Sequence, residues 1–202
     1  MTDEVVNYAA LNRPEVFTQE QLGWVPWLHA PAVEDLSDRQ YEGLVDRSRA
    51  SSDYFRLLAR DPDILGARTR TDKDIFYNTK EGLPRAEREL AAAATSRENG
   101  CVFCASVHAR FASHYSGRQD DIQRLLDEGA SADLGPRWNA IASAAKALAQ
   151  TPPQLKAEHI RALKLEGLDA LEVSDVIHGA AFFNWANRLM LSLGEPEETN
   201  RH

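Results

Sequence analysis

Apolar residues recur every three or four positions along most of the chain from Ser37 onward, a spacing typical of helices that bury one face. Capping residues, glycines and prolines separate these periodic stretches. The segment from Ser37 to Gln40, for example, has the form of a helix-starting capping box. The pattern predicts helices over residues 38–45, 54–58, 62–67, 85–99, 101–116, 120–129, 136–148, 155–165 and 171–193.

Strand signals are nearly absent, because no sustained alternation of apolar and polar residues flanks a hairpin turn. We therefore predict an all-α fold: a single-domain bundle of about eight helices spanning residues 36–202. Residues 1–35, interrupted by three prolines, predict an extended arm whose aromatic side chains pack on this domain. The residues from Pro196 onward are expected to form a frayed tail.

The net charge and the apolar runs of the chain argue against several classes of protein. The 202 residues carry a formal net charge of -8, which argues against nucleic acid or an anionic membrane as a partner. The start of the chain lacks the basic and apolar regions of a secretory signal, and no apolar run approaches the roughly 20 residues of a membrane span. We expect a cytoplasmic protein, in which a pair of cysteines is catalytic, redox-active or metal-binding.

Both cysteines of the chain, Cys101 and Cys104, lie in one C-x-x-C motif, and His108 follows four residues later. Each helical residue advances about 100°, so the three side chains are expected to share one face of a helix. Asn99-Gly100 predicts the end of the preceding helix. The cysteines then lie near a helix start, where the dipole and free N–H groups favour a thiolate.

The segment from Glu89 to His108 resembles the alkylhydroperoxidase D-like proteins of the carboxymuconolactone decarboxylase superfamily. Their signature is a glutamate, eleven residues, and then C-x-x-C-x-x-x-H, matched here by Glu89, Cys101, Cys104 and His108. The stretch from Phe182 to Leu189 is similar to a branch described as uncharacterised peroxidase-related enzymes. The likeness covers roughly residues 36–195 and implies an all-α, commonly oligomeric fold with thiol peroxidase or disulfide reductase activity.

The resemblance also implies a role for each signature residue. Cys104 matches the peroxidatic cysteine and Cys101 the resolving one, while Glu89 and His108 match a proton relay that deprotonates the peroxidatic thiol. The best-known members carry a histidine just before the second cysteine, whereas this chain has Phe103 and so lacks one proton-transfer partner. The implied partners are a hydroperoxide substrate, a dithiol or disulfide reductant and further copies of the chain, with no cofactor and no metal.

Residue chemistry alone leaves alternatives open. The helix dipole favours Cys101 as the low-pKa thiol, whereas proximity to His108 favours Cys104, which we choose on the family pattern. Cys101, Cys104 and His108 could instead hold zinc in a non-enzymatic protein. A disulfide reductase without peroxide specificity has the same motif.

The last predicted helix carries polar residues among its apolar ones, including His178, Asn184 and Asn187. Buried polar groups need partners, so we expect these residues to bridge helices or subunits. The alternative is that His178 or Asn184 faces the cysteines.

Overall fold

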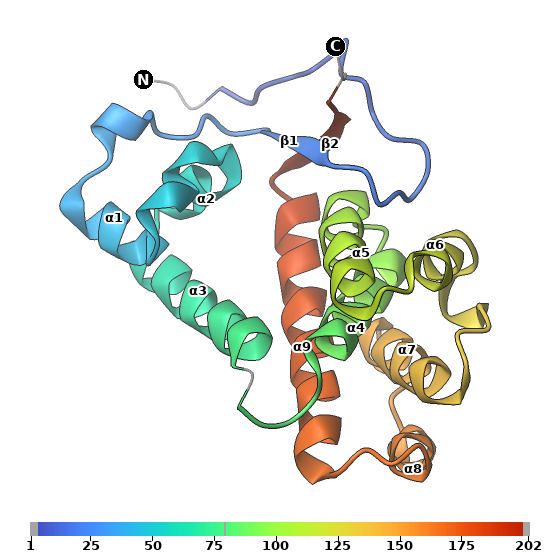
Figure 1. Cartoon of the computed structure of the whole chain (residues 1–202). Helices are drawn as coiled ribbons and strands as arrows, with labels where there is room; N and C mark the ends of the chain where they lie inside the picture. The colour runs from blue at the N-terminus through green and yellow to red at the C-terminus, as the bar shows by residue number, and fades with distance from the viewer. Residues whose placement is uncertain (1–3, 79, 200–202) are drawn as a thin grey trace.

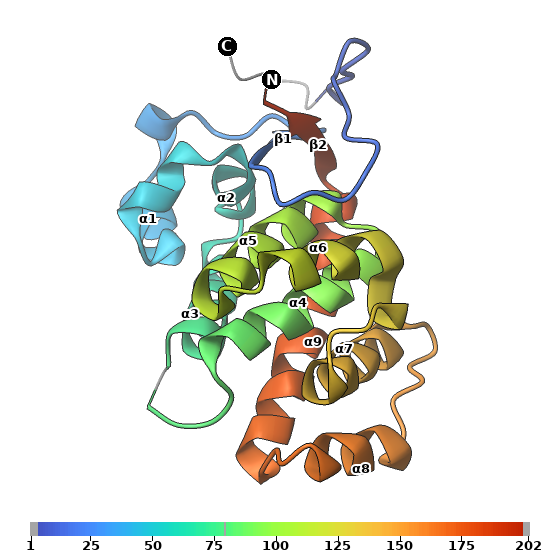
Figure 2. The ribbon, with the colours of Figure 1, turned by 45° about the vertical axis from the view of Figure 1, so that its right-hand side comes forward.

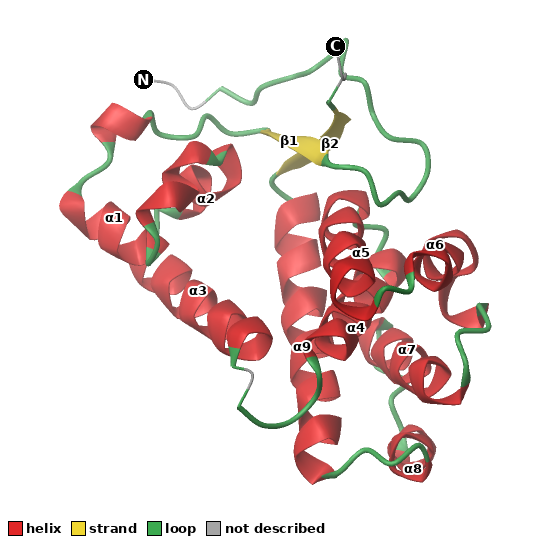
Figure 3. Ribbon diagram, in the orientation of Figure 1, coloured by secondary structure: helices red, strands yellow, loops and turns green. Residues whose placement is uncertain are grey.

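Nine α-helices carry most of the described chain in the computed structural model, which describes residues 4–78 and 80–199 (Figure 3). The predicted all-α fold is confirmed, with α4 and α5 beginning and ending within about two residues of their expected bounds. The helices are α1 (Asp38–Leu44), α2 (Asp53–Leu58), α3 (Pro62–Tyr77), α4 (Arg85–Glu98), α5 (Val102–Ser116), α6 (Gln119–Glu128), α7 (Pro136–Ala149), α8 (Ala157–Leu165) and α9 (Ala170–Leu191).

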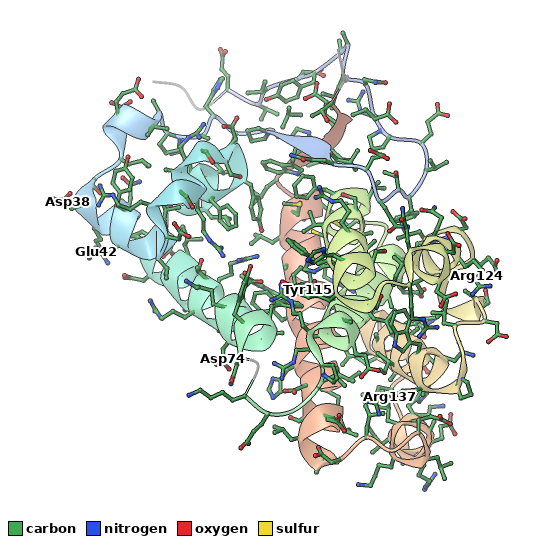
Figure 4. All side chains as sticks on the ribbon, viewed as in Figure 1. Asp38, Glu42, Asp74, Tyr115, Arg124 and Arg137 are labelled. Carbon is green, nitrogen blue, oxygen red and sulfur yellow. The ribbon has the colours of Figure 1, made fainter. Side chains whose placement is uncertain are left out.

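Helix α4 is the centre of the fold, with α5, α7 and α9 packed around it (Figures 1 and 2). Its run from Leu90 to Ala94 is almost completely buried. Alanine side chains are short, so the neighbouring helices approach α4 closely on several faces. Ion pairs also join α4, α7 and α9. Arg137 of α7, labelled in Figure 4, pairs with Glu87 of α4 and Glu172 of α9.

Helices α1, α2 and α3 form a separate layer on one side of α9 (Figure 1). The expected capping box at Ser37 is present, and Asp61 caps α3 with Pro62 in its first turn. Helix α3 is longer than predicted, because it continues without a break to Tyr77. Residues 68–74 are mostly polar, and only a narrow stripe that includes Thr69 and Phe76 is buried, so the second half of the helix has little apolar periodicity.

The structure corrects two expectations about strands and the tail. Leu22–Pro26 (β1) and Gly194–Glu198 (β2) pair as a small antiparallel sheet, so residues from Pro196 to Glu198 are a strand and not a frayed tail. The sheet lies over the ends of α9 and α5 (Figures 1 and 3). Gly194 permits the pairing, because a Cβ there would collide with the Val25 carbonyl and the Trp24 ring.

Of the helices in the described residues, none combines the length and apolar character that crossing a membrane requires.

Candidate active site

A cavity of about 570 Å³ lies between the layer of α2 and α3 on one side and α5 and α9 on the other, with β1 at one end. Much of its wall is aromatic, with contributions from Trp24, Tyr54, Phe76, Phe103 and Phe183. The cavity therefore offers flat apolar surfaces to a ligand.

Both cysteines are reduced and buried at the start of α5. Cys101 is the N-cap residue and Cys104 lies in the first turn, which agrees with the predicted position near a helix start. Cys101 is 1% exposed and does not line the cavity, whereas Cys104 is 7% exposed and does. Cys104 Sγ also lies 3.5 Å from the Met190 sulfur of α9. A molecule in the cavity thus meets Cys104, with Cys101 behind it.

The two thiols have opposite pKa shifts. The Cys104 thiol donates a hydrogen bond to Cys101 and lowers the pKa of Cys101, and the Cys104 backbone N–H adds to this effect against the opposing effect of burial. The pKa of Cys104 is raised well above its usual value, first by that hydrogen bond and then by burial, with Arg68 acting in the opposite direction. The first proton lost from the pair therefore leaves a thiolate at Cys101.

Asn187 is the residue of α9 that reaches the cysteines. Its side chain is completely buried, hydrogen-bonds to both thiols and lowers the pKa of Cys101. It also donates to Ser96 Oγ at 3.0 Å and accepts from Asn99 Nδ2 at 3.0 Å, so α4 fixes its orientation. We expected a helix bridge at Asn187 and named only His178 and Asn184 as residues that could face the cysteines. The family signature lies entirely on α4 and the start of α5, so it gave no signal for a partner on α9.

Glu89 and His108 form a buried pair. Glu89 is 1% exposed, and its Oε2 lies 2.5 Å from His108 Nδ1. Arg85, one turn earlier on α4, donates from Nε to the other oxygen of Glu89 at 2.6 Å. The guanidinium of Arg85 also hydrogen-bonds the Phe76 carbonyl, so it ties the carboxylate to the end of α3. Sequence reasoning assigned no role to Arg85, although it adjoins the family signature.

Aromatic rings hold the His108 imidazole in place. Phe76 of α3 stacks on it at a centroid distance of 5.2 Å, and Phe183 of α9 meets it edge-on at 3.9 Å. His108 and Cys104 line the same cavity, but no hydrogen bond joins His108 to either thiol. The spacing of four residues thus places the imidazole near Cys104 while Glu89 fixes its direction.

The arrangement does not favour the zinc alternative. That alternative requires Cys101, Cys104 and His108 to converge on one point. Among residues 4–78 and 80–199, no three histidine, cysteine, aspartate or glutamate side chains are grouped so that they could hold a metal ion. His108 is instead directed to Glu89, and the thiols are directed to each other and to Asn187.

Residues 62–147, which contain all four signature residues, match the model of the carboxymuconolactone decarboxylase family. The chain is similar to this family over these residues. No curated protein matches the sequence significantly.

Solved structures that resemble this chain share its fold. An uncharacterised peroxidase-related protein with an alkylhydroperoxidase AhpD core, from Ralstonia eutropha, is 23% identical with a TM-score of 0.69, and the match covers 81% of this chain and 87% of that one. A second uncharacterised peroxidase-related protein, from a Silicibacter species, is 20% identical with a TM-score of 0.68 over 83% and 90% of the two chains. The debrominase Bmp8 is 18% identical with a TM-score of 0.61 over 80% and 83%. At these identities the likeness shows the fold.

Proposed function

We propose that this protein is a thiol-dependent, peroxidase-like oxidoreductase that reduces hydroperoxides through Cys104 and Cys101. The observation that carries the proposal is the free dithiol at the cavity wall, with Cys104 facing the cavity and the buried Glu89–His108 pair lining the same space. The superfamily relationship and the peroxidase-related structures of the same fold are consistent with this chemistry.

The first chemical step uses Cys104 because it is the thiol that a substrate can reach. Its proton moves to the neighbouring Cys101 thiolate, and the Cys104 thiolate then attacks the terminal oxygen of the hydroperoxide. The O–O bond breaks, Cys104 becomes a sulfenic acid, and the leaving alkoxide takes up a proton and departs as an alcohol. Cys101 next attacks the Cys104 sulfur, and a disulfide forms as water is released. An external dithiol reduces this disulfide and is itself oxidised.

Glu89 and His108 act on protons in this scheme. The carboxylate orients the imidazole through Nδ1, which leaves the other ring nitrogen as the group able to exchange a proton within the cavity. Since no hydrogen bond joins His108 to either thiol, its proton passes through a substrate oxygen or a water molecule. Phe103, where better-known members have a histidine, lines the cavity and offers no second proton carrier.

The experiment is steady-state reduction of an organic hydroperoxide with a small dithiol as reductant. Cys104→Ser is expected to abolish turnover, because it removes the nucleophile. Glu89→Gln is expected to lower kcat by about a hundredfold or more, the usual range for disabling a general acid–base group. Glu98→Gln is the matched control: it removes an exposed carboxylate from the same helix and is expected to leave kcat unchanged.

The thermal unfolding temperature of each variant is measured alongside, because Glu89 also balances the buried charge of Arg85. Turnover by folded Cys104→Ser at the wild-type rate would contradict the proposal. So would a wild-type protein that reduces a small disulfide but no hydroperoxide, since that behaviour identifies a disulfide reductase.

A further inference from the structure

Two arginines that line the cavity take part in no step of the proposed chemistry. Arg49 lies in the 3₁₀ turn Arg47–Ser51, and Arg68 lies on α3. The Arg68 side chain is only 8% exposed and that of Arg49 is 18% exposed. A guanidinium cannot shed its proton to reduce the cost of burial, so each needs a partner of opposite charge or good acceptors.

Both arginines form ion pairs with the same carboxylate, that of Asp72. Asp72 Oδ2 lies 3.3 Å from Arg68 Nη1 and 3.5 Å from Arg49 Nη2. The remaining charged groups of the cavity, Arg85 and Glu89, are paired with each other. The cavity wall therefore has one more positive than negative side chain, in a protein whose formal net charge is -8.

Hydrogen-bond donors of this wall are left unpaired. Among the described residues, six buried side-chain nitrogen or oxygen atoms have no hydrogen-bond partner. Four of them belong to cavity-lining residues: Trp24 Nε1, Arg49 Nη1, Arg68 Nε and Arg68 Nη1, the last of which has only its ion pair with Asp72. All four are N–H groups. Neither cysteine sulfur accepts a hydrogen bond from them, although the charge of Arg68 lowers the pKa of Cys104. Buried donors without acceptors are costly, which indicates that a ligand supplies the acceptors.

Aromatic packing holds the two guanidiniums in position. Arg49 lies over the Phe55 ring with its Cζ 4.7 Å from the centroid, and Arg68 lies 5.4 Å from the same centroid. Arg68 also lies 5.4 Å from the Phe182 centroid. Because the planes are fixed before a ligand arrives, little side-chain entropy is lost when the ligand binds.

We propose that Arg49, Arg68 and Trp24 form a carboxylate-binding subsite, and that the ligand is a small aromatic monocarboxylate whose opposite end extends toward Cys104. The single excess positive charge matches a monoanion, and the planar guanidinium donors match the two oxygens of a carboxylate. The cavity, at about 570 Å³ with an aromatic wall, accommodates one substituted ring. This inference rests on the proposed function, and it identifies the substrate as an organic hydroperoxide that bears a carboxylate.

The test measures binding to the reduced, full-length protein by isothermal titration calorimetry, with 3-phenylpropionate and its neutral counterpart 3-phenylpropionamide as probes. The acid is expected to bind at least tenfold more tightly than the amide. Arg68→Gln and Arg49→Gln are each expected to weaken binding of the acid at least tenfold while leaving the amide unaffected. Arg70→Gln, an exposed position on the same helix, is the control and is expected to change neither affinity.

Equal affinity of the wild-type protein for the acid and the amide would overturn the proposal without recourse to any variant. Tighter binding of inorganic phosphate than of the acid would overturn the assignment to carboxylates. The assay involves no turnover, so it separates this inference from the proposed function: a protein that binds the acid but reduces no hydroperoxide would retain the subsite and lose the peroxidase assignment.

Discussion

A reactive cysteine usually has both a lowered pKa and access to the substrate. In this protein the two properties belong to different residues, Cys101 and Cys104. Cys101 has the lowered pKa, because it accepts hydrogen bonds from the Cys104 thiol and from Asn187, whereas Cys104 has access to the cavity. The sequence arguments named the helix dipole and His108 as the causes of a lowered pKa, whereas the first cause in the structure is the hydrogen bond between the two thiols.

This division predicts the pH dependence of thiolate formation, followed by absorbance at 240 nm against a variant lacking both cysteines. In the wild-type protein one thiolate is expected to form at a lower pH than that of an ordinary thiol, because the pKa of Cys101 is lowered. In Cys104→Ala the step is expected to move to higher pH, because the largest cause of that lowering is removed and burial remains.

Met190→Leu is the control for that titration, since it changes the other neighbour of Cys104 and leaves the hydrogen bond between the thiols in place. Its first step is expected to coincide with that of the wild-type protein. A step in Cys104→Ala at the wild-type pH would show that the Cys104 thiol does not stabilise the Cys101 thiolate.

The residues of the site that sequence reasoning found are those within one short segment. Glu89 and His108 lie nineteen positions apart on two consecutive helices, and the family signature paired them before any contact was known. Asn187 and Arg68 could not be found in this way, because they come from α9 and α3 and reach the cavity only through helix packing. The spacing of residues along the chain does not show which helices pack against one another.

At the scale of elements, local chemistry predicted how helices begin and end. Helix caps depend on residues that are close together in the chain, so the sequence shows them directly. Examples are the capping box at Ser37, Pro62 in the first turn of α3 and Gly117 after α5. The pairing of β1 with β2 joins residues more than 160 positions apart and lacks an alternating apolar pattern. It was therefore missed, and with it the position of Trp24 at the cavity.

Gly194→Ala tests whether this sheet positions the end of the cavity. The added Cβ would collide with the Val25 carbonyl and the Trp24 ring, so we expect a loss of about 1–3 kcal/mol in the free energy of unfolding and altered tryptophan fluorescence. The measurements are denaturant unfolding and an emission spectrum of the folded protein.

Gly23→Ala is the matched control on the opposite strand. Its Cβ would meet only side-chain atoms, the nearest being Thr199 Cγ2 at 3.3 Å, so a change within about 0.5 kcal/mol is expected. Equal stability of the two variants would mean that the close approach at Gly194 contributes nothing to the fold.

For the whole molecule, charge is distributed unevenly between the surface and the cavity. Asp38, Glu42 and Asp74, labelled in Figure 4, are exposed on α1 and α3, and they contribute to the formal net charge of -8. The cavity wall has the opposite excess. The Arg68 and Arg49 side chains are largely buried, which limits the screening of their charge by salt. The surface charge therefore governs encounter, and the arginines govern retention of an anionic ligand. A reductant without a large negative charge approaches this surface most readily.

A hydroperoxide is expected to convert Cys101 and Cys104 into a disulfide. The most direct measurement is the intact mass of the protein after brief exposure to a small excess of organic hydroperoxide, followed by alkylation under denaturing conditions. We expect a protein lighter by the mass of two hydrogen atoms that takes up no alkylating agent. A protein that takes up two alkyl groups after this exposure would contradict the account.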